Sequence, residues 1–303
     1  MSNAESILTK QSLPTRDAHD HPSSTKRFDD GGQYRVEIPS CEGPAAMQAV
    51  ISEAAVRQVP VHRVSQGSGI MLQTDHEISE MLALGREHGI EVCLFVGPRA
   101  SWDTGAQAVS SAGRVLGASL RGADQLGYGI DDVLHGVKLG LKSILVGDLG
   151  HLKVLGDMKR AGDLPKEFVL KTSVTIAAAN PASARVLEDL GATSINLPVD
   201  LSIAQIAAIR QAIDTPIDFY VESPDDFGGG VRHYEAPALV RVAAPIYLKY
   251  GIRNSPGLYP SGMHIEGMVV NLSKERVRRA AISLALLKRY MPDAVASPYG
   301  VRS

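Results

Sequence analysis

Charged and amide side chains recur along this chain at the ends of short apolar runs, each just before a helical pattern. Burying so many polar groups without partners costs several kcal/mol each, so they must pair with one another, with a ligand or with a metal. For any single residue a structural ion pair is an alternative, but the whole set indicates a functional site. The set is Glu37, Arg63, Gln66, Arg99, Asp148, Lys171, Asn196, Glu222 and Lys249.

The segment from Glu222 to Glu235 is the strongest candidate for a catalytic loop. It holds four carboxylates, one histidine and three consecutive glycines directly after an apolar run. We predict Glu222 as a general base or metal ligand and His233 as its acid/base partner. His264 and Glu266 would point the same way along an extended chain and complete a divalent metal site, although His264 is equally a surface or capping histidine.

Two lysines, Lys171 and Lys249, lie at the ends of apolar runs. Burial favours the neutral amine, which is the form that attacks a carbonyl carbon to make a Schiff base. The simpler alternative is an ion pair with Glu37, Glu222 or Asp148. Both lysines and Asp148 are therefore candidates for the catalytic set.

Glycine-rich and arginine-bearing segments predict recognition of an anion. The loop Ser65–Gly69 offers backbone N–H groups and hydroxyls because glycine permits close approach, although a tight turn explains it nearly as well. Arginine forks suit a carboxylate or phosphate if the loops that carry them converge. The resulting substrate-binding candidates are Glu37, Arg63, Gln66, Ser68, Arg99, Arg121 and Asn196.

Eight apolar runs alternate with helical patterns, which predicts a parallel sheet because strands buried on both faces read as continuous apolar runs. Eight such units favour an α/β fold of the (β/α)8 type, a TIM-like barrel whose strand ends converge on one pocket. The runs span residues 34–40, 61–66, 91–99, 143–148, 168–173, 193–198, 216–222 and 245–249. A further run at 117–121, which would make nine, falls in an insertion at about 100–124 that is expected near the barrel mouth.

Helix signals separate the runs. Thr74 to Glu77 forms a capping box, Asn180 precedes a helix, and Ser202 begins another. An amphipathic pattern from Ser273 to Tyr290 predicts a C-terminal helix.

The barrel domain is expected to span residues 33–303. Residues 1–32 lack a hydrophobic period and are expected to form a flexible arm. A metal site in this arm is disfavoured because nothing nearby would fix the geometry of Asp17, His19, Asp20 and His21.

Composition restricts the partners. A formal net charge of −2 gives no broad basic field, so neither nucleic acid nor an anionic membrane is an expected partner. The two cysteines, Cys41 and Cys93, favour a reducing compartment, and neither a membrane-spanning run nor a signal pattern occurs. We expect a cytoplasmic protein with a small-molecule substrate, and a homo-oligomer is compatible with the composition.

Several segments occur in a characteristic order, namely Ser143–Gly150, Leu170–Ser173, Asn180–Ala184, Leu190–Ala192, Leu201–Ile206 and Tyr247–Arg253. Taken together, from Glu37 to about Arg253, the chain resembles the collagenase-like peptidase family U32. The last of these segments is similar to the Lys-Ile-Glu-Gly-Arg segment of the family, and adds Arg253 to the substrate-binding candidates. The resemblance implies a peptidase-like hydrolase on a barrel.

Two departures from the family bear on activity. The cysteine-bearing signature of the family should follow Glu222, but no cysteine occurs there, and Gly251 replaces the glutamate of the last segment. In family members that modify RNA or assist quinone hydroxylation, such cysteines hold an iron–sulfur cluster. The comparison therefore implies no iron–sulfur cluster in this chain.

Three functions remain compatible with the sequence. The first is a U32-like hydrolase or lyase that acts on a small polar or anionic substrate by acid/base chemistry, with or without a divalent metal. The second is a Schiff-base lyase or aldolase that uses Lys171 or Lys249. The third is a non-catalytic accessory protein on the same scaffold.

Overall fold

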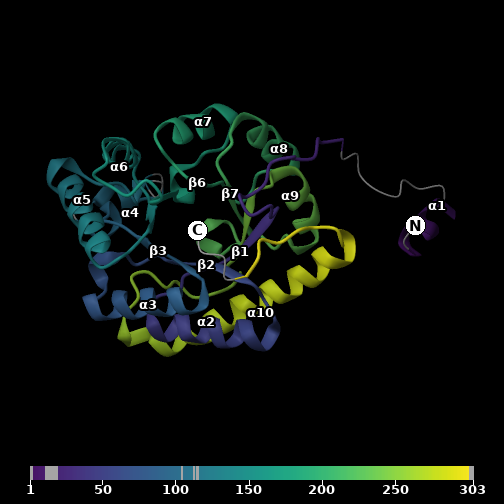
Figure 1. Ribbon diagram of the computed structural model, residues 1–303, viewed down its shortest axis with the longest axis horizontal. Helices are drawn as coiled ribbons and strands as arrows, with labels where there is room; N and C mark the ends of the chain where they lie inside the picture. The colour runs from purple at the N-terminus through teal and green to yellow at the C-terminus, as the bar shows by residue number, and fades with distance from the viewer. Residues whose placement is uncertain (1–2, 11–19, 104, 112, 114–115, 300–303) are drawn as a thin grey trace.

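The structure is a computed structural model that describes residues 3–10, 20–103, 105–111, 113 and 116–299. Eight parallel strands close into a barrel in chain order, and β8 pairs back with β1 (Figure 1). This confirms the predicted (β/α)8 barrel. The strands are β1 (Tyr34–Pro39), β2 (Val61–Gln66), β3 (Glu91–Phe95), β4 (Ser143–Val146), β5 (Val169–Thr172), β6 (Ser194–Asn196), β7 (Ile217–Glu222) and β8 (Ile246–Tyr250).

Helices surround the barrel and alternate with its strands. The longest, α10, packs along α2 on the outside of the barrel (Figure 1). The α-helices are α1 (Asn3–Lys10), α2 (Pro44–Arg57), α3 (Asp75–His88), α4 (Ala106–Val109), α5 (Gly122–Lys138), α6 (Leu149–Ala161), α7 (Pro181–Asp189), α8 (Ile203–Ala212), α9 (Ala236–Ala243) and α10 (Glu266–Tyr290).

Local capping fixes where the helices begin. Thr74 and Glu77 form the predicted capping box at the start of α3. Asn180 and Ser202 cap α7 and α8 in the same way, each bonded to the backbone N–H three residues later. These bonds satisfy amide groups that have no partner within the helix.

The predicted C-terminal helix is longer than its pattern suggested. α10 begins at Glu266 rather than at Ser273, because Met268, Val269 and Leu272 continue its apolar stripe against the core. Residues 117–121 are turn and loop rather than a ninth strand.

Part of the segment assigned to a flexible arm packs against the barrel. Phe28 is buried and lies edge-on to the ring of Tyr247, with ring centroids 5.3 Å apart. Lys26 donates to the carbonyl of Ile213 at 2.6 Å. Residues around Phe28 and Lys26 therefore pack against the barrel, although the polar composition of this segment did not indicate burial. Asp17 and His19 lie outside the described residues.

Apolar side chains fill the space between the strands and the helices. Val36, Ile38, Leu94, Ile144 and Leu170 are all buried there. The interior of the barrel itself is polar, whereas barrels of this type are usually filled with branched apolar side chains. Among the helices in the described part of the chain, none has both the length and the apolar character that a membrane crossing requires.

Candidate functional site

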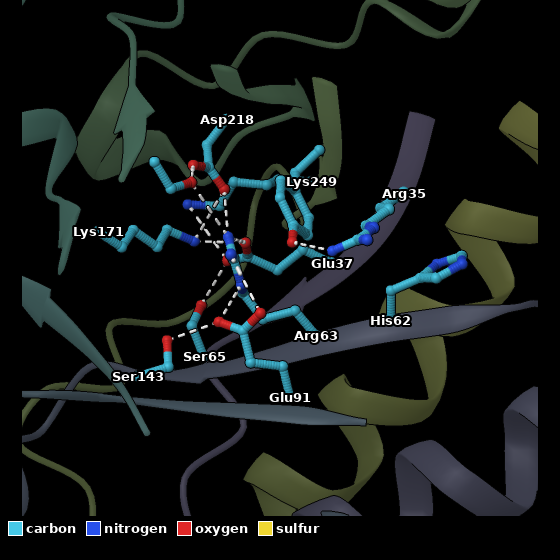
Figure 2. A network of polar contacts seen from close by, with 12 residues as sticks. Arg35, Glu37, His62, Arg63, Ser65, Glu91, Ser143, Lys171, Asp218 and Lys249 are labelled. Carbon is cyan, nitrogen blue, oxygen red and sulfur yellow. Dashed lines mark hydrogen bonds and ion pairs between the residues drawn. The ribbon is translucent and has the colours of Figure 1, made fainter. Parts of the chain in front are cut away.

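Six charged side chains form a connected set inside the barrel (Figure 2). Arg63 reaches Asp218 at 2.9 Å and Glu91 at 2.8 Å, and Lys171 lies 3.1 Å from Asp218 and also contacts Glu37. Serine hydroxyls complete the set, since Ser65 donates to Glu37 and Ser143 donates to Glu91, each at 2.6 Å. We call this set the ionic layer; its members are Glu37, Arg63, Glu91, Lys171, Asp218 and Lys249.

The ionic layer balances its own charge, with three carboxylates against three cations. Burial alone would raise the pKa of Glu37, but the cations of Lys171, Lys249 and Arg63 hold it well below its usual range. For Asp218 burial prevails over the attraction of Lys171 and Arg63, so its pKa is raised. The structural ion-pair alternative therefore describes Glu37, Arg63 and Lys171.

Above the ionic layer, the carboxyl ends of the strands surround a cavity of about 420 Å³, which we call the mouth cavity. Ligand sites typically have volumes of roughly 300–1,000 Å³, so it has room for a small molecule. The insertion contributes to its wall, as expected from its position after β3. Lining residues include Pro39, Ser65, Gln66, Phe95, Arg99, Trp102, Ser173, Asn196, Tyr220, Asp226, Phe227, Lys249 and Tyr259.

Lys249 connects the ionic layer to the mouth cavity. Its Nζ atom lies 3.6 Å from Oε1 of Glu37 and 4.1 Å from the centroid of the Tyr220 ring. The side chain is 2% exposed, yet it lines the cavity. A primary amine is therefore held against the floor of the cavity with one carboxylate beside it.

Arg99 is held at the wall of the same cavity. Its guanidinium lies between the rings of Phe95 and Trp102, 3.8 Å from each centroid, and Nη2 donates to the carbonyl of Gly67 at 2.7 Å. Its Nε is buried without a hydrogen-bond partner. Burial lowers the pKa of Arg99 to about 10, although Tyr259 and Glu42 act in the opposite direction.

The loop Ser65–Gly69 does bind an anion, but the anion belongs to the protein. The carboxylate of Glu42 accepts from the backbone N–H of Gly67 at 2.6 Å, and from both the N–H and the hydroxyl of Ser68. Ser68 is thereby occupied and does not line the mouth cavity. Gln66 does line the cavity, but its amide is bonded to the backbone of Gly69.

Glu222 and His233 meet as predicted, but behind the barrel wall. His233 Nε2 lies 2.8 Å from Glu222, and Arg279 of α10 lies 3.3 Å from the same carboxylate. Burial would raise the pKa of Glu222, but the bonds from His233 and from the backbone N–H of Arg253, with the charge of Arg279, lower it. Neither Glu222 nor His233 lines the mouth cavity.

The pairing of β7 with β8 explains this placement. The register shifts between Tyr220 and Glu222, so the strict alternation of faces is broken at that point. Tyr220 still follows the alternation from Asp218 and faces the cavity, whereas Glu222, beyond the shift, faces α10. The loop after β7 still reaches the cavity through Asp226 and Phe227.

The other predicted residues lie apart from the cavity. Asp148 caps α6 by accepting from the backbone N–H of His151 at 2.8 Å. Arg121 is exposed at the start of α5. The side chain of Arg253 is 62% exposed and lies 4.0 Å from Asp225.

The predicted metal pair does not have the geometry that its prediction assumed. His264 lies in a short 3-10 turn and Glu266 is the first residue of α10, so the chain is not extended there, and both side chains are exposed. Across the described ranges, no group of three or more His, Cys, Asp or Glu side chains is arranged to hold a metal ion.

Sequence reasoning missed several cavity residues, among them Tyr220, Trp102 and Tyr259. Tyr220 could have been found, because it alternates with Asp218 along β7. Trp102 lies in the insertion and Tyr259 in the loop after β8, and no local pattern marks either of them. Asn196, a predicted substrate-binding residue, lines the cavity, and its Oδ1 is buried without a partner.

The fold and this cavity define a (β/α)8-barrel protein whose candidate site lies at the carboxyl ends of the strands. Residues 128–223 match the sequence profile of peptidase family U32, which confirms the predicted resemblance over that segment. The matched segment runs from within α5 to just beyond β7 and contains neither Arg99 nor Lys249. No curated protein matches the chain in sequence.

Several solved structures resemble the chain at low identity. The U32 peptidase Mk0906 is 14% identical with a TM-score of 0.43, over 80% of this chain and 99% of that chain. A native KDPGal structure is 11% identical with a TM-score of 0.49, over 87% and 98% of the respective chains. A truncated 3-deoxy-D-arabino-heptulosonate 7-phosphate synthase from Thermotoga maritima is 13% identical with a TM-score of 0.49, over 87% and 89%. Function must therefore be argued from the site.

Proposed function

We propose that this protein is an enzyme that forms a Schiff base between Lys249 and the carbonyl group of a small polar substrate, and that it then acts as a lyase. The observation that supports this proposal is the placement of the Lys249 amine at the floor of the mouth cavity. Within the described part of the chain, Lys249 is the one lysine among the residues that line this cavity. A buried amine at the centre of a barrel mouth is well placed for covalent catalysis.

The ionic layer suits this chemistry because Schiff-base formation preserves its charge. The ammonium first releases a proton, the neutral amine attacks the carbonyl carbon, and the resulting carbinolamine expels its oxygen as water. The net step converts an ammonium and a carbonyl into an iminium and one water molecule. Since the iminium keeps the positive charge beside Glu37, no buried carboxylate is left without its cation.

Glu37 beside Lys249, and Asp218 linked to Glu37 through Lys171, are the candidates for the transient proton acceptor. Glu37 is adjacent to the amine, and Lys171 joins Glu37 to Asp218. The raised pKa of Asp218, caused by burial, makes it the better of the two at holding a proton. The iminium then withdraws electrons from the substrate, so that a bond to the adjacent carbon can break.

Lys171 is disfavoured as the nucleophile. It is fully buried, contacts both Glu37 and Asp218, and is absent from the cavity lining. A substrate in the mouth cavity therefore meets Lys249 first.

Borohydride trapping tests the proposal. The protein would be incubated with pyruvate, 2-oxoglutarate, dihydroxyacetone phosphate and glyceraldehyde 3-phosphate in turn, reduced, and examined by intact mass and peptide mapping. We expect an adduct on Lys249 with at least one compound, none in Lys249→Met, and an unchanged adduct in the control Lys142→Met, which alters an exposed lysine. No adduct on Lys249 with any member of the panel would contradict the proposal.

The match to peptidase family U32 favours a second candidate, hydrolysis of a small peptide-like amide in the same cavity. The same preparations distinguish the two candidates when they are also incubated with a dipeptide library. Cleavage that survives in Lys249→Met, with no trapped adduct in the wild type, would favour the hydrolase. Neither cleavage nor trapping would favour the non-catalytic accessory role.

A further inference from the structure

The mouth cavity contains a cation that the protein does not neutralise. Arg99 is 8% exposed, and its contacts within the described residues are with the Gly67 carbonyl and two aromatic rings, with no carboxylate in an ion pair. Asp226 lines the same cavity but is exposed at its rim. Glu42, whose charge also acts on Arg99, already accepts from Gly67 and Ser68. A buried, unpaired guanidinium is costly, so its presence indicates an anionic ligand.

The surroundings of Arg99 restrict how such a ligand can approach. The Cζ atom of Arg99 lies 3.8 Å from the ring centroids of both Phe95 and Trp102, so the two rings limit access to the guanidinium. A ligand is expected to approach the N–H groups at its edge, among which Nε has no partner. Edge-on contact is the geometry in which a guanidinium fork pairs with the oxygens of a carboxylate or phosphate.

Asn196 adds a second constraint on the ligand. Its Oδ1 is buried in the cavity wall without a donor. An unsatisfied buried acceptor requires a donor from the ligand, such as a hydroxyl group.

We infer that the substrate is an anionic carbonyl compound, a carboxylate or phosphate ester bearing a hydroxyl group, whose anionic end binds the edge of Arg99 and whose hydroxyl donates to Asn196. This inference rests on the proposed use of the mouth cavity by the substrate of the enzyme. It does not require that Lys249 form a Schiff base. Arg99 thus sets the charge of the substrate, and Lys249 carries out the chemistry.

The fluorescence of Trp102, beside Arg99, can report this binding. Trp102 is the single tryptophan of the chain, and it stacks on the guanidinium of Arg99. An anion at the Arg99 edge changes the electrostatic field at the indole, so Trp102 emission should respond to it. The signal can be read in Lys249→Met, where no Schiff base forms.

The test is a fluorescence titration of Lys249→Met with pyruvate, glycerate and inorganic phosphate, against the neutral hydroxyacetone, at matched ionic strength. Saturable changes are expected with the anions, and at least one of them should bind about 10-fold or more tightly than hydroxyacetone. Adding Arg99→Met should weaken anion binding about 10-fold or more, whereas Arg99→Lys should retain part of it. The control Arg86→Met, at an exposed arginine outside the mouth cavity, should leave anion binding unchanged.

Each result separates this inference from the Schiff-base proposal. A response of Trp102 to anions without any borohydride adduct would retain the role of Arg99 and remove that of Lys249. Equal binding of hydroxyacetone and the anions in a folded protein would overturn the inference, as would wild-type anion binding in both Arg99 variants. An adduct on Lys249 that forms equally well with neutral and anionic carbonyls would also overturn it while leaving the Schiff base intact.

Discussion

Tyr220 and Glu222 lie two residues apart on β7, yet they face opposite sides of the barrel wall. Tyr220 lines the mouth cavity, whereas Glu222 is bonded to His233 and to Arg279 of α10. The register shift between them in the pairing with β8 produces this reversal. Glu222 therefore stabilises the contact between the barrel and α10, and Tyr220 belongs to the candidate site.

Substitution of Glu222 should lower stability without affecting the chemistry. Glu222→Gln removes the charge that His233 and Arg279 face, and should reduce the free energy of unfolding by about 2–4 kcal/mol. Urea unfolding measures this loss, and adduct formation at Lys249 should persist. Glu275→Gln, at the partly exposed partner of Arg279, is the matched control and should change stability by less than about 1 kcal/mol. Unchanged stability with loss of the adduct would assign Glu222 to catalysis instead.

Removing one member of the ionic layer should be strongly destabilising. Lys171→Met leaves Glu37 and Asp218 facing an uncharged side chain, at an expected cost of about 3–5 kcal/mol. Adding Glu37→Gln should recover part of this loss, because the two residues interact directly. A double-mutant cycle based on urea unfolding gives the interaction free energy. If the stability losses of Lys171→Met and Glu37→Gln simply add in the double variant, Lys171 and Glu37 do not form the buried pair that the structure shows.

His151 should make stability depend on pH between about 4 and 6.5. Burial lowers its pKa from 6.5 to about 4, so the folded state holds the neutral ring while the unfolded state takes up a proton. The contribution of the neutral His151 ring to the free energy of unfolding is therefore fully present above pH 6.5. It is lost as the pH falls towards 4, by on the order of 3 kcal/mol.

Unfolding by urea at a series of pH values measures this dependence. His151→Gln should remove most of the change in unfolding free energy with pH. His76→Gln, at a histidine whose side chain is 89% exposed, should leave that pH dependence unchanged. A slope that is identical in the wild type and in His151→Gln would place the titrating group elsewhere.

Gly67 is expected to be required for the shape of the mouth cavity. A Cβ atom at this position would overlap Cε1 of Tyr259, so Gly67→Ala must displace that ring from the cavity edge. We expect a loss of stability of about 1–3 kcal/mol and weaker anion binding at Trp102. Gly127→Ala is the control, since its Cβ would enter open space in α5 and should stabilise the helix by roughly 0.5–1 kcal/mol. Unaltered binding in Gly67→Ala would show that Tyr259 has no part in the site.

Much of the barrel could be predicted from the sequence because its signals are local. Strands buried on both faces give continuous apolar runs, and the cap at Thr74 depends on residues three positions apart. The length of α10 and the packing of Phe28 were missed, since both depend on contacts with distant parts of the chain.

The candidate site was only partly predictable. Arg99, Asn196 and Lys249 follow from the rule that strand ends meet at one pocket, and all three line it. That Glu222 lies outside the cavity lining could not be predicted, because a register shift leaves no mark in the sequence. Glu42 was overlooked although it fills the loop that the glycines predicted to bind an anion, because its position depends on how β1 and β2 are placed side by side.

The ionic layer also limits how this protein can evolve. Each member contacts at least one oppositely charged member, so a single change to an apolar residue takes an opposite charge away from at least one buried partner, at up to about 3–5 kcal/mol for a fold of typically 5–15 kcal/mol. A stepwise route to an apolar interior would therefore pass through destabilised intermediates. Descendants are therefore expected to keep this polar interior, or to exchange its members in compensating pairs, while the walls of the mouth cavity remain free to diverge towards new substrates.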